Sequence, residues 1–148
     1  MRYYSYEDFK KDTNLVLKDL KLLDIDMIVA VARGGLIFAH SISEGLKIRN
    51  VQSIRTELYD DNKKREKITI YDNCNFKGVK NILVVDDISD SGETLDAIMK
   101  KFKNENQNLN FKTVTLFYKK SSCFEPDLWV NEATQWIEFF WEKDFLKD

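Results

Sequence analysis

The stretch of sequence that decides the fold is ILVVDDISDSGETL, residues 82–95. Its first four residues are apolar and three of them are β-branched, which predicts a buried strand over Asn81–Asp86. Two adjacent acids, Asp86 and Asp87, stand where this strand ends. A polar turn follows them, and a helix is expected from about Thr94 to Phe102. A strand, a short turn and a helix in this order form the first half of a βαβ unit.

Other strands and helices alternate on both sides of this segment. Met27–Ala32 and Val114–Tyr118 are short apolar runs rich in β-branched and aromatic residues, and both are predicted to be buried strands. One helix is expected after Ser5, which suits an N-cap, and another over Leu36–Leu46. The alternation predicts an α/β fold with a mainly parallel, twisted sheet flanked by helices. In such sheets ligands bind at the carboxyl ends of the strands.

Two further strand candidates are separated by a polar stretch. Val51–Leu58 and Ile68–Tyr71 have the composition of strands. Residues 58–67 between them are mostly charged, with a basic run at 63–65. We expect this stretch to be a solvated surface loop, because it is mostly charged and shows no apolar periodicity.

Composition and charge restrict the class of protein. The 148 residues make one domain, which can bury a hydrophobic core without disulfides or a structural metal. The net charge of −2 argues against a nucleic-acid binder. Cys74, Cys123 and His40 are too few for a disulfide scaffold or a metal centre of cysteines and histidines, so we expect two free thiols and a histidine without catalytic role. No stretch resembles a signal peptide or membrane span, so a soluble, cytoplasmic protein is expected.

The loop after residue 86 has the chemistry of a phosphate site. Neighbouring residues of a strand point to opposite faces, so Asp86 and Asp87 can serve different oxygens or a metal. Ser89–Thr94 places small residues, hydroxyls and backbone N–H groups at a helix N-terminus, which predicts an anion cradle. A phosphate attached to a polyol, with Mg²⁺ bridging to oxygens, suits this combination. We expect both carboxylates to lie in solvent at the strand end, so that their loss costs little stability.

This string closely resembles the phosphoribosyl-pyrophosphate (PRPP) signature of type I phosphoribosyltransferases, in which an apolar strand, two acids and a D-[ST]-G-x-T loop follow one another. The resemblance implies that Asp86 and Asp87 bind the ribose hydroxyls and help to hold Mg²⁺. It implies that the following loop binds PRPP, chiefly through its 5′-phosphate. The residues of this loop are Ser89, Asp90, Ser91, Gly92, Glu93 and Thr94. Asp90 is in addition a candidate catalytic proton acceptor near purine N7.

A second motif, Arg33-Gly34-Gly35, follows the strand predicted over Met27–Ala32. Two glycines let the backbone approach a polyanion closely, and Arg33 adds a delocalised cation. The motif resembles the pyrophosphate loop of the same family, in which the peptide bond is often cis. By this resemblance Arg33 is both a PRPP-binding and a catalytic residue. The polar stretch 58–67 would be the mobile loop that closes over the site.

The C-terminal part of the chain resembles bacterial xanthine–guanine phosphoribosyltransferases. Residues 136–142, WIEFFWE, are similar to the aromatic segment of their small C-terminal hood. Lys119 stands at the end of a predicted strand, where these enzymes carry a lysine that donates to the purine 6-oxo group. The resemblance implies that Lys119, Trp136 and Ile137 bind the purine. It also implies one domain over 1–148, with a core of about 25–120 and a hood of about 121–148 joined by the N-terminal segment.

These observations lead to one functional expectation. The resemblance implies an enzyme of purine salvage that transfers ribose 5-phosphate from PRPP to guanine, xanthine or hypoxanthine and releases pyrophosphate. Its cofactor would be Mg²⁺ and its ligands PRPP and the purine base. The chain would form a dimer or tetramer with copies of itself and would not bind nucleic acid. Three alternatives stay open: a PRPP-binding regulatory protein, a phosphoribosyltransferase for another acceptor such as a pyrimidine, and an unrelated phosphate-binding α/β protein.

Overall fold

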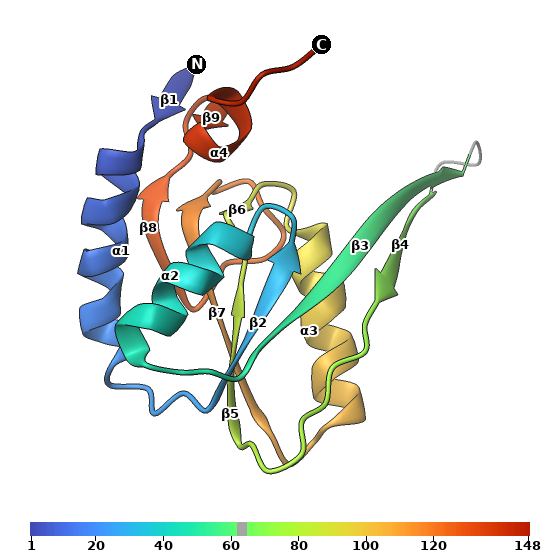
Figure 1. The fold of residues 1–148 in the computed structure, drawn as a ribbon. Helices are drawn as coiled ribbons and strands as arrows, with labels where there is room; N and C mark the ends of the chain where they lie inside the picture. Colours follow the sequence, from blue (N-terminus) through green and yellow to red (C-terminus); the bar gives the residue numbers. More distant parts are fainter. Residues whose placement is uncertain (62–64) are drawn as a thin grey trace.

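A computed structural model of the protein describes residues 1–61 and 65–148 (Figure 1). Strands and helices alternate through most of this chain, as the sequence predicts. The elements in chain order are β1 (Arg2–Tyr4), α1 (Tyr6–Leu20), β2 (Met27–Ala32), α2 (Leu36–Leu46), β3 (Val51–Asp61), β4 (Arg65–Tyr71), β5 (Asn81–Val85), β6 (Ile88–Ser89), α3 (Glu93–Glu105), β7 (Asn110–Tyr118), β8 (Leu128–Glu132), β9 (Ile137–Phe139) and α4 (Phe140–Lys143). No helix of the described chain is both long and apolar enough to cross a bilayer.

The main sheet has seven strands in the order β4-β3-β2-β5-β7-β6, with β8 as a further neighbour of β7. Every pair is parallel except β3 with β4. The mainly parallel sheet is thus confirmed. Met27 is opposite Ile82, and Ile82 is opposite Phe111, so β2, β5 and β7 run side by side in one direction. Their carboxyl ends therefore meet at one edge, where loops from distant parts of the chain come together.

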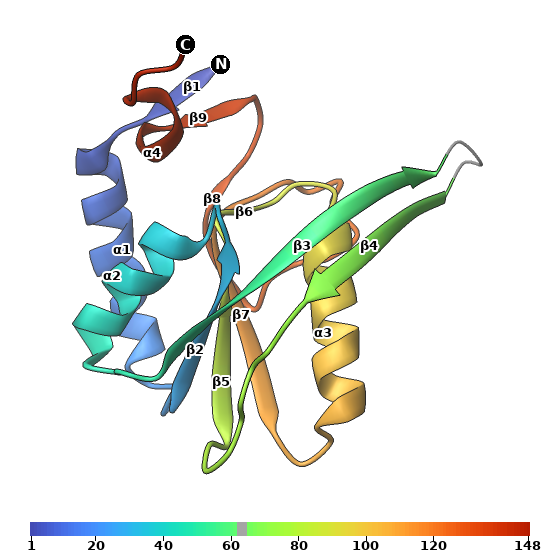
Figure 2. The same ribbon diagram turned by 45° about the vertical axis from the view of Figure 1, so that its right-hand side comes forward.

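Helices cover both faces of this sheet. α1 and α2 lie on one face and α3 on the other, as Figure 2 shows most clearly. Successive residues of β2 alternate between the two cores: Ile28 packs in the cluster of α1 and α2, and Val29 packs in that of α3. Both residues are fully buried. A continuous apolar run with a helix layer on each side is the pattern of a buried parallel strand.

Local signals place several elements correctly. The Ser5 hydroxyl accepts a hydrogen bond from the Asp8 N–H at 3.1 Å, as expected of an N-cap. β2 and α2 have the predicted limits, and α2 ends where Lys47 adopts a left-handed conformation with φ of 57°. Phe9 is buried on the face of α1 that packs against α2. Its ring meets that of Phe38 edge to face, with the ring centroids 6.2 Å apart.

The expected loop over 58–67 is wrong in its extent. β3 continues to Asp61, β4 begins at Arg65, and these two residues are paired in the antiparallel ladder. Figure 1 shows the resulting long hairpin, which extends away from the rest of the molecule. The basic residues Lys63 and Lys64 lie outside the described residues. Strand prediction failed here because it depends on apolar residues that this polar ribbon lacks.

A small second sheet joins the two ends of the chain. β1 pairs in parallel with β9, with Arg2 opposite Ile137 and Tyr4 opposite Phe139. The fully buried Tyr4 donates a hydrogen bond from its hydroxyl to the Asp12 carboxylate at 2.7 Å, which ties this sheet to α1. Three-residue strands carry too little pattern for prediction from sequence, so β1 and β9 were not anticipated.

Candidate active site

The two adjacent acids lie at the carboxyl end of β5, but they are not in solvent. Asp86 is 9% exposed and Asp87 is 8% exposed, so the expectation of solvated carboxylates is wrong. The loop after β2 covers them: a Cβ atom on Gly34 would lie only 2.7 Å from Cγ of Asp87. This approach explains the need for glycine at position 34, since any side chain would displace the carboxylate.

Burial changes the acidity of both groups. Removal from water raises the pKa of Asp86 well above its usual range, and the neighbouring charge of Asp87 adds to the effect. Burial also raises the pKa of Asp87, to about 6, although hydrogen bonds to its ionised form oppose the shift. Asp87 Oδ1 accepts from the Ile88 N–H at 2.8 Å, and Asp86 Oδ1 accepts from the Asp87 N–H at 2.8 Å. Two close, desolvated carboxylates are costly unless a cation neutralises them.

These residues fit a magnesium ion. Carboxylate oxygens are the ligands that Mg²⁺ prefers, and it commonly binds through one or two carboxylates together with substrate oxygens. Asp86 and Asp87 meet that description, and no cluster of three or more acids, histidines or cysteines suited to a metal is found in the part of the chain that the structure describes. The geometry therefore suits a metal that arrives with its substrate better than a closed structural site.

The glycine-rich loop connects β2 to α2 beside the acids. Its Ala32–Arg33 peptide bond is cis, as the resemblance to the pyrophosphate loop implies. Gly35 is the N-cap residue of α2, and a Cβ atom there would lie 2.9 Å from the Val31 carbonyl oxygen. The exposed Arg33 side chain stands next to this tight turn. The loop thus combines a cation with closely accessible backbone.

Two cavities open at this edge of the sheet, of about 890 and 390 Å³. The larger one is lined by five predicted site residues: Arg33, Gly34, Asp86, Asp87 and Thr94. The smaller one is lined by Asp87 again and by four further predicted residues: Asp90, Lys119, Trp136 and Ile137. Asp87 and Glu142 line both, so the cavities meet at these two carboxylates. The structure thereby brings together the two halves of the predicted site.

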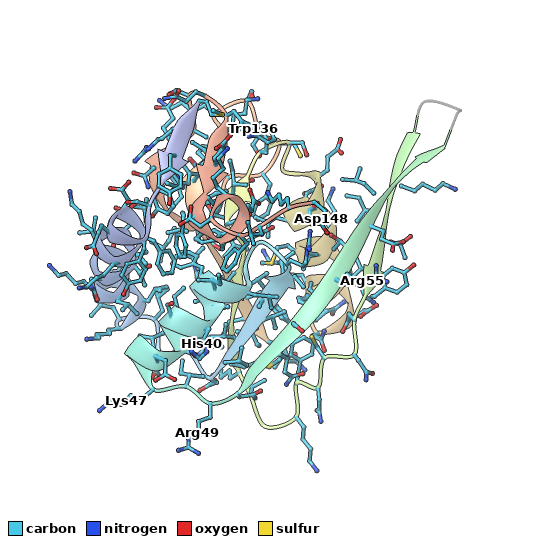
Figure 3. The ribbon with its side chains drawn as sticks, turned by 45° about the horizontal axis from the view of Figure 1, so that its top comes forward. His40, Lys47, Arg49, Arg55, Trp136 and Asp148 are labelled. Carbon is cyan, nitrogen blue, oxygen red and sulfur yellow. The ribbon has the colours of Figure 1, made fainter. Side chains whose placement is uncertain are left out.

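In the smaller cavity a carboxylate and an ammonium group lie close together. Lys119 Nζ lies 3.5 Å from Asp90 Oδ1, and both side chains are more than half exposed. Trp136 is 71% exposed and, as Figure 3 shows, lies at the same end of the molecule, just before β9. An exposed indole, a cation and a carboxylate around one hollow can hold a flat, polar ring by its face and its edge.

The remaining predicted residues line neither cavity. They are Gly35, Ser89, Ser91, Gly92 and Glu93. Gly92 is the N-cap residue of α3 with φ of 86° and has no side chain to cap the helix, while the Ser91 hydroxyl accepts from the Glu93 N–H at 3.3 Å. Such an end leaves N–H groups for an anion next to Thr94. Ser89 is only 2% exposed, and its hydroxyl donates to the Phe124 carbonyl at 2.8 Å, so this side chain serves the loop rather than a ligand.

Sequence reasoning missed the residues that the C-terminal segment adds. Trp141, Glu142, Phe145 and Lys147 line the larger cavity, as does Thr56 of β3. Trp141 stacks on Phe139 with ring centroids 4.6 Å apart, which fixes α4 beside the acids. Figure 3 shows the chain after α4 crossing this edge of the sheet to Asp148. The WIEFFWE segment contains Trp141 and Glu142, but no sequence pattern marks Lys147.

Comparison with known proteins agrees with this geometry. The family model for the phosphoribosyl transferase domain matches residues 15–146. The chain is 29% identical over 144 residues to a xanthine-guanine phosphoribosyltransferase of Idiomarina loihiensis, covering 95% of this chain and 86% of that protein.

Solved structures show the same likeness in three dimensions. The Helicobacter pylori xanthine-guanine-hypoxanthine phosphoribosyltransferase superposes with a TM-score of 0.90 at 34% identity, over 97% of this chain and 94% of the other. A purine phosphoribosyltransferase from Pyrococcus horikoshii gives a TM-score of 0.84 at 28% identity, over 99% and 97% of the two chains. With its family match, its fold and its paired cavities, this chain belongs to the phosphoribosyltransferase family and is a transferase enzyme.

Proposed function

We propose that this enzyme transfers ribose 5-phosphate from PRPP to a 6-oxopurine base and releases pyrophosphate, in cytoplasmic purine salvage. The observation that carries the proposal is the meeting of the two cavities at the buried Asp87. One cavity offers a cation and a glycine-rich loop, as a diphosphate requires, and the other offers groups for a flat heterocycle. The ribose that links them would lie over the acids. The three relatives described above are all named for purine, xanthine or guanine substrates.

The larger cavity accounts for the leaving group. As the bond from C1 to pyrophosphate breaks, negative charge grows on the diphosphate and the ribose becomes cationic. Arg33 and Lys147 are the two cationic side chains among the described residues that line this cavity. Cations placed where charge develops lower the barrier more than they strengthen substrate binding.

The acids hold the sugar and the metal. Asp86 and Asp87 would accept hydrogen bonds from the ribose 2′- and 3′-hydroxyls and hold Mg²⁺, which when bound supplies charge neutralisation to the diphosphate. Their raised pKa values mean that burial disfavours ionisation, and a bound cation would oppose this effect by favouring the charged carboxylates. The amides at the start of α3, near Thr94, would hold the 5′-phosphate. The sugar is thereby fixed at both ends.

The smaller cavity accounts for the base. On a 6-oxopurine, O6 and N7 are neighbours on one edge of the ring. Lys119 and Asp90, 3.5 Å apart, match that edge, because the ammonium donates to O6 and the carboxylate accepts the N7 proton as the new bond forms. Trp136 would stack on the ring, and the backbone at Ile137 would face the group at C2. Adenine carries an amino group at C6 and would leave Lys119 without an acceptor.

The direct test is pyrophosphate release from PRPP and Mg²⁺ with one base at a time. We expect turnover of guanine, xanthine and hypoxanthine, guanine being at least as good as hypoxanthine, and none of adenine or orotate. Efficient use of adenine or orotate would refute the assignment of the smaller cavity. Tight PRPP binding without turnover of any base would instead identify a regulatory protein.

A further inference from the structure

The loop after β7 is joined to the phosphate loop after β5 along much of its length. The Lys119 N–H donates to the Ser89 carbonyl oxygen at 3.0 Å, and the Cys123 N–H donates to the Ser91 carbonyl oxygen at 2.8 Å. These two bonds bracket the tip of each loop. The first of them starts from the residue that we assign to the purine 6-oxo group, so the base site and the phosphate loop share backbone hydrogen bonds.

Ser122 lies at the centre of this contact. Its hydroxyl oxygen is 2.9 Å from that of Ser89 and 3.0 Å from the Phe124 carbonyl oxygen, and its single proton can be donated to either of these acceptors. The Ser89 hydroxyl donates to the Phe124 carbonyl at 2.8 Å, and Ser89 is only 2% exposed. The backbone N–H of Ser122 in turn donates to the Lys119 carbonyl at 2.8 Å. One residue therefore contacts both the buried end of the phosphate loop and the backbone of the base-binding lysine.

The shape of the phosphate loop depends on the same contact. Gly92 has φ of 86°, and a Cβ atom there would lie 2.6 Å from the Phe124 nitrogen and 3.0 Å from the Cys123 nitrogen. The start of α3 thus rests directly on the loop after β7. A glycine is needed at position 92 for this close approach as well as for its backbone conformation.

We propose that Ser122 is a positioning residue, which keeps the phosphate loop in register with Lys119 so that both move as one rigid unit. The inference rests on the proposed function. Ser122 lines neither cavity and acts only through its neighbours. The distance between the 5′-phosphate and the base determines whether the base nitrogen is aligned with C1, and a misplacement of about 1 Å can lower the rate about 100-fold.

The test compares Ser122→Ala with Ser121→Ala, the matched change at the exposed neighbouring serine. We expect Ser122→Ala to lower kcat/KM for PRPP at least tenfold, and Ser121→Ala to change it less than threefold. If Ser122→Ala fails to fold, the pair Ser122→Thr and Ser122→Val replaces it. These side chains have the same shape, and only threonine keeps the hydroxyl, so threonine should retain most of the activity that valine loses.

A double-mutant cycle separates positioning from simple loss of folded enzyme. A reduced folded fraction would lower activity by the same factor in any background, whereas positioning depends on the lysine being positioned. We expect the tenfold effect of Ser122→Ala to shrink below threefold in a Lys119→Met background. Equal effects in both backgrounds, or activity of Ser122→Ala equal to that of Ser121→Ala, would overturn the inference and leave the proposed function intact. A wild-type enzyme without phosphoribosyl transfer would overturn both.

Discussion

Replacement of Asp87 by Asn should make the ligand-free protein more stable while it destroys PRPP binding. The carboxyl group is 8% exposed, and burial raises its pKa from 3.8 to about 6. An asparagine at this position keeps an oxygen that can accept the Ile88 N–H, now 2.8 Å away, and it carries no charge. The variant therefore removes a desolvated charge and retains the local hydrogen bond.

The expected gain follows from the shift and depends on pH. The rise of the pKa from 3.8 to about 6 corresponds to ~3 kcal/mol. The ionised carboxylate lowers the unfolding free energy of the wild type by this amount. Below pH 3.8 the group is protonated in both the folded and the unfolded chain, so the charge makes no difference. Between pH 3.8 and about 6 the unfolded chain loses the proton first, so the folded state becomes less favoured. The advantage of the variant should therefore appear across this interval and be complete above it.

Urea denaturation at a series of pH values measures this difference. Asp26 provides a control of opposite sign, because its pKa is lowered by hydrogen bonds from the N–H groups of Asn81 and Lys80, at 2.8 and 3.0 Å. Asp26→Asn should reduce stability at neutral pH, and this loss should disappear in acid. If Asp87→Asn were less stable than the wild type at pH 7.5, or equally stable at every pH, the account of the buried acids would be refuted.

Further variants test the other parts of the site. Replacing both Asp86 and Asp87 by Asn should abolish Mg²⁺-dependent PRPP binding in calorimetry while circular dichroism shows a folded protein; unaltered affinity would contradict their role. Arg33→Ala should lower turnover more than it weakens base binding, because the charge that it neutralises grows in the transition state; equal losses would count against this. Lys119→Met should depress activity with guanine without lowering the melting temperature, and full activity would exclude the lysine from the base site. Lys147→Gln should raise KM for PRPP several-fold and leave KM for the base unchanged. The control is Lys143→Gln, because Lys143 Nζ lies 3.5 Å from Glu138 Oε2 and the side chain does not line this cavity.

The parts of the fold that sequence predicts are those with local signals. β2 and β5 are apolar runs followed by turn residues, and the Ser5 hydroxyl caps α1 as its sequence position indicates. The glycine-rich loop and the acids follow such strands, so a parallel sheet brings them to one edge without further information. The gathering of these loops at one edge could therefore be anticipated from the prediction of a mainly parallel sheet.

The rest depends on contacts between distant parts of the chain. Gly34, which is 53 positions earlier, packs closely against the buried Asp87 side chain, and no local pattern reports that approach. The pairing of Tyr4 with Phe139 joins two segments of three residues each. Lys147 reaches the larger cavity only because Trp141 is held against Phe139. Such positions follow from packing in three dimensions, which periodicity and composition do not encode.

The conflict between stability and function is concentrated at the acids. Glu142 faces Asp87 across the junction of the two cavities, and its charge contributes to the raised pKa of Asp87. Without a cation, the two buried carboxylates and the nearby charge of Glu142 oppose the folded state; Mg²⁺ held by Asp86 and Asp87 would neutralise part of this charge. A sequence chosen only for stability would place neutral residues here. If the acids hold Mg²⁺ as proposed, we expect metal and substrate to bind together, since either one alone would leave part of this charge uncompensated.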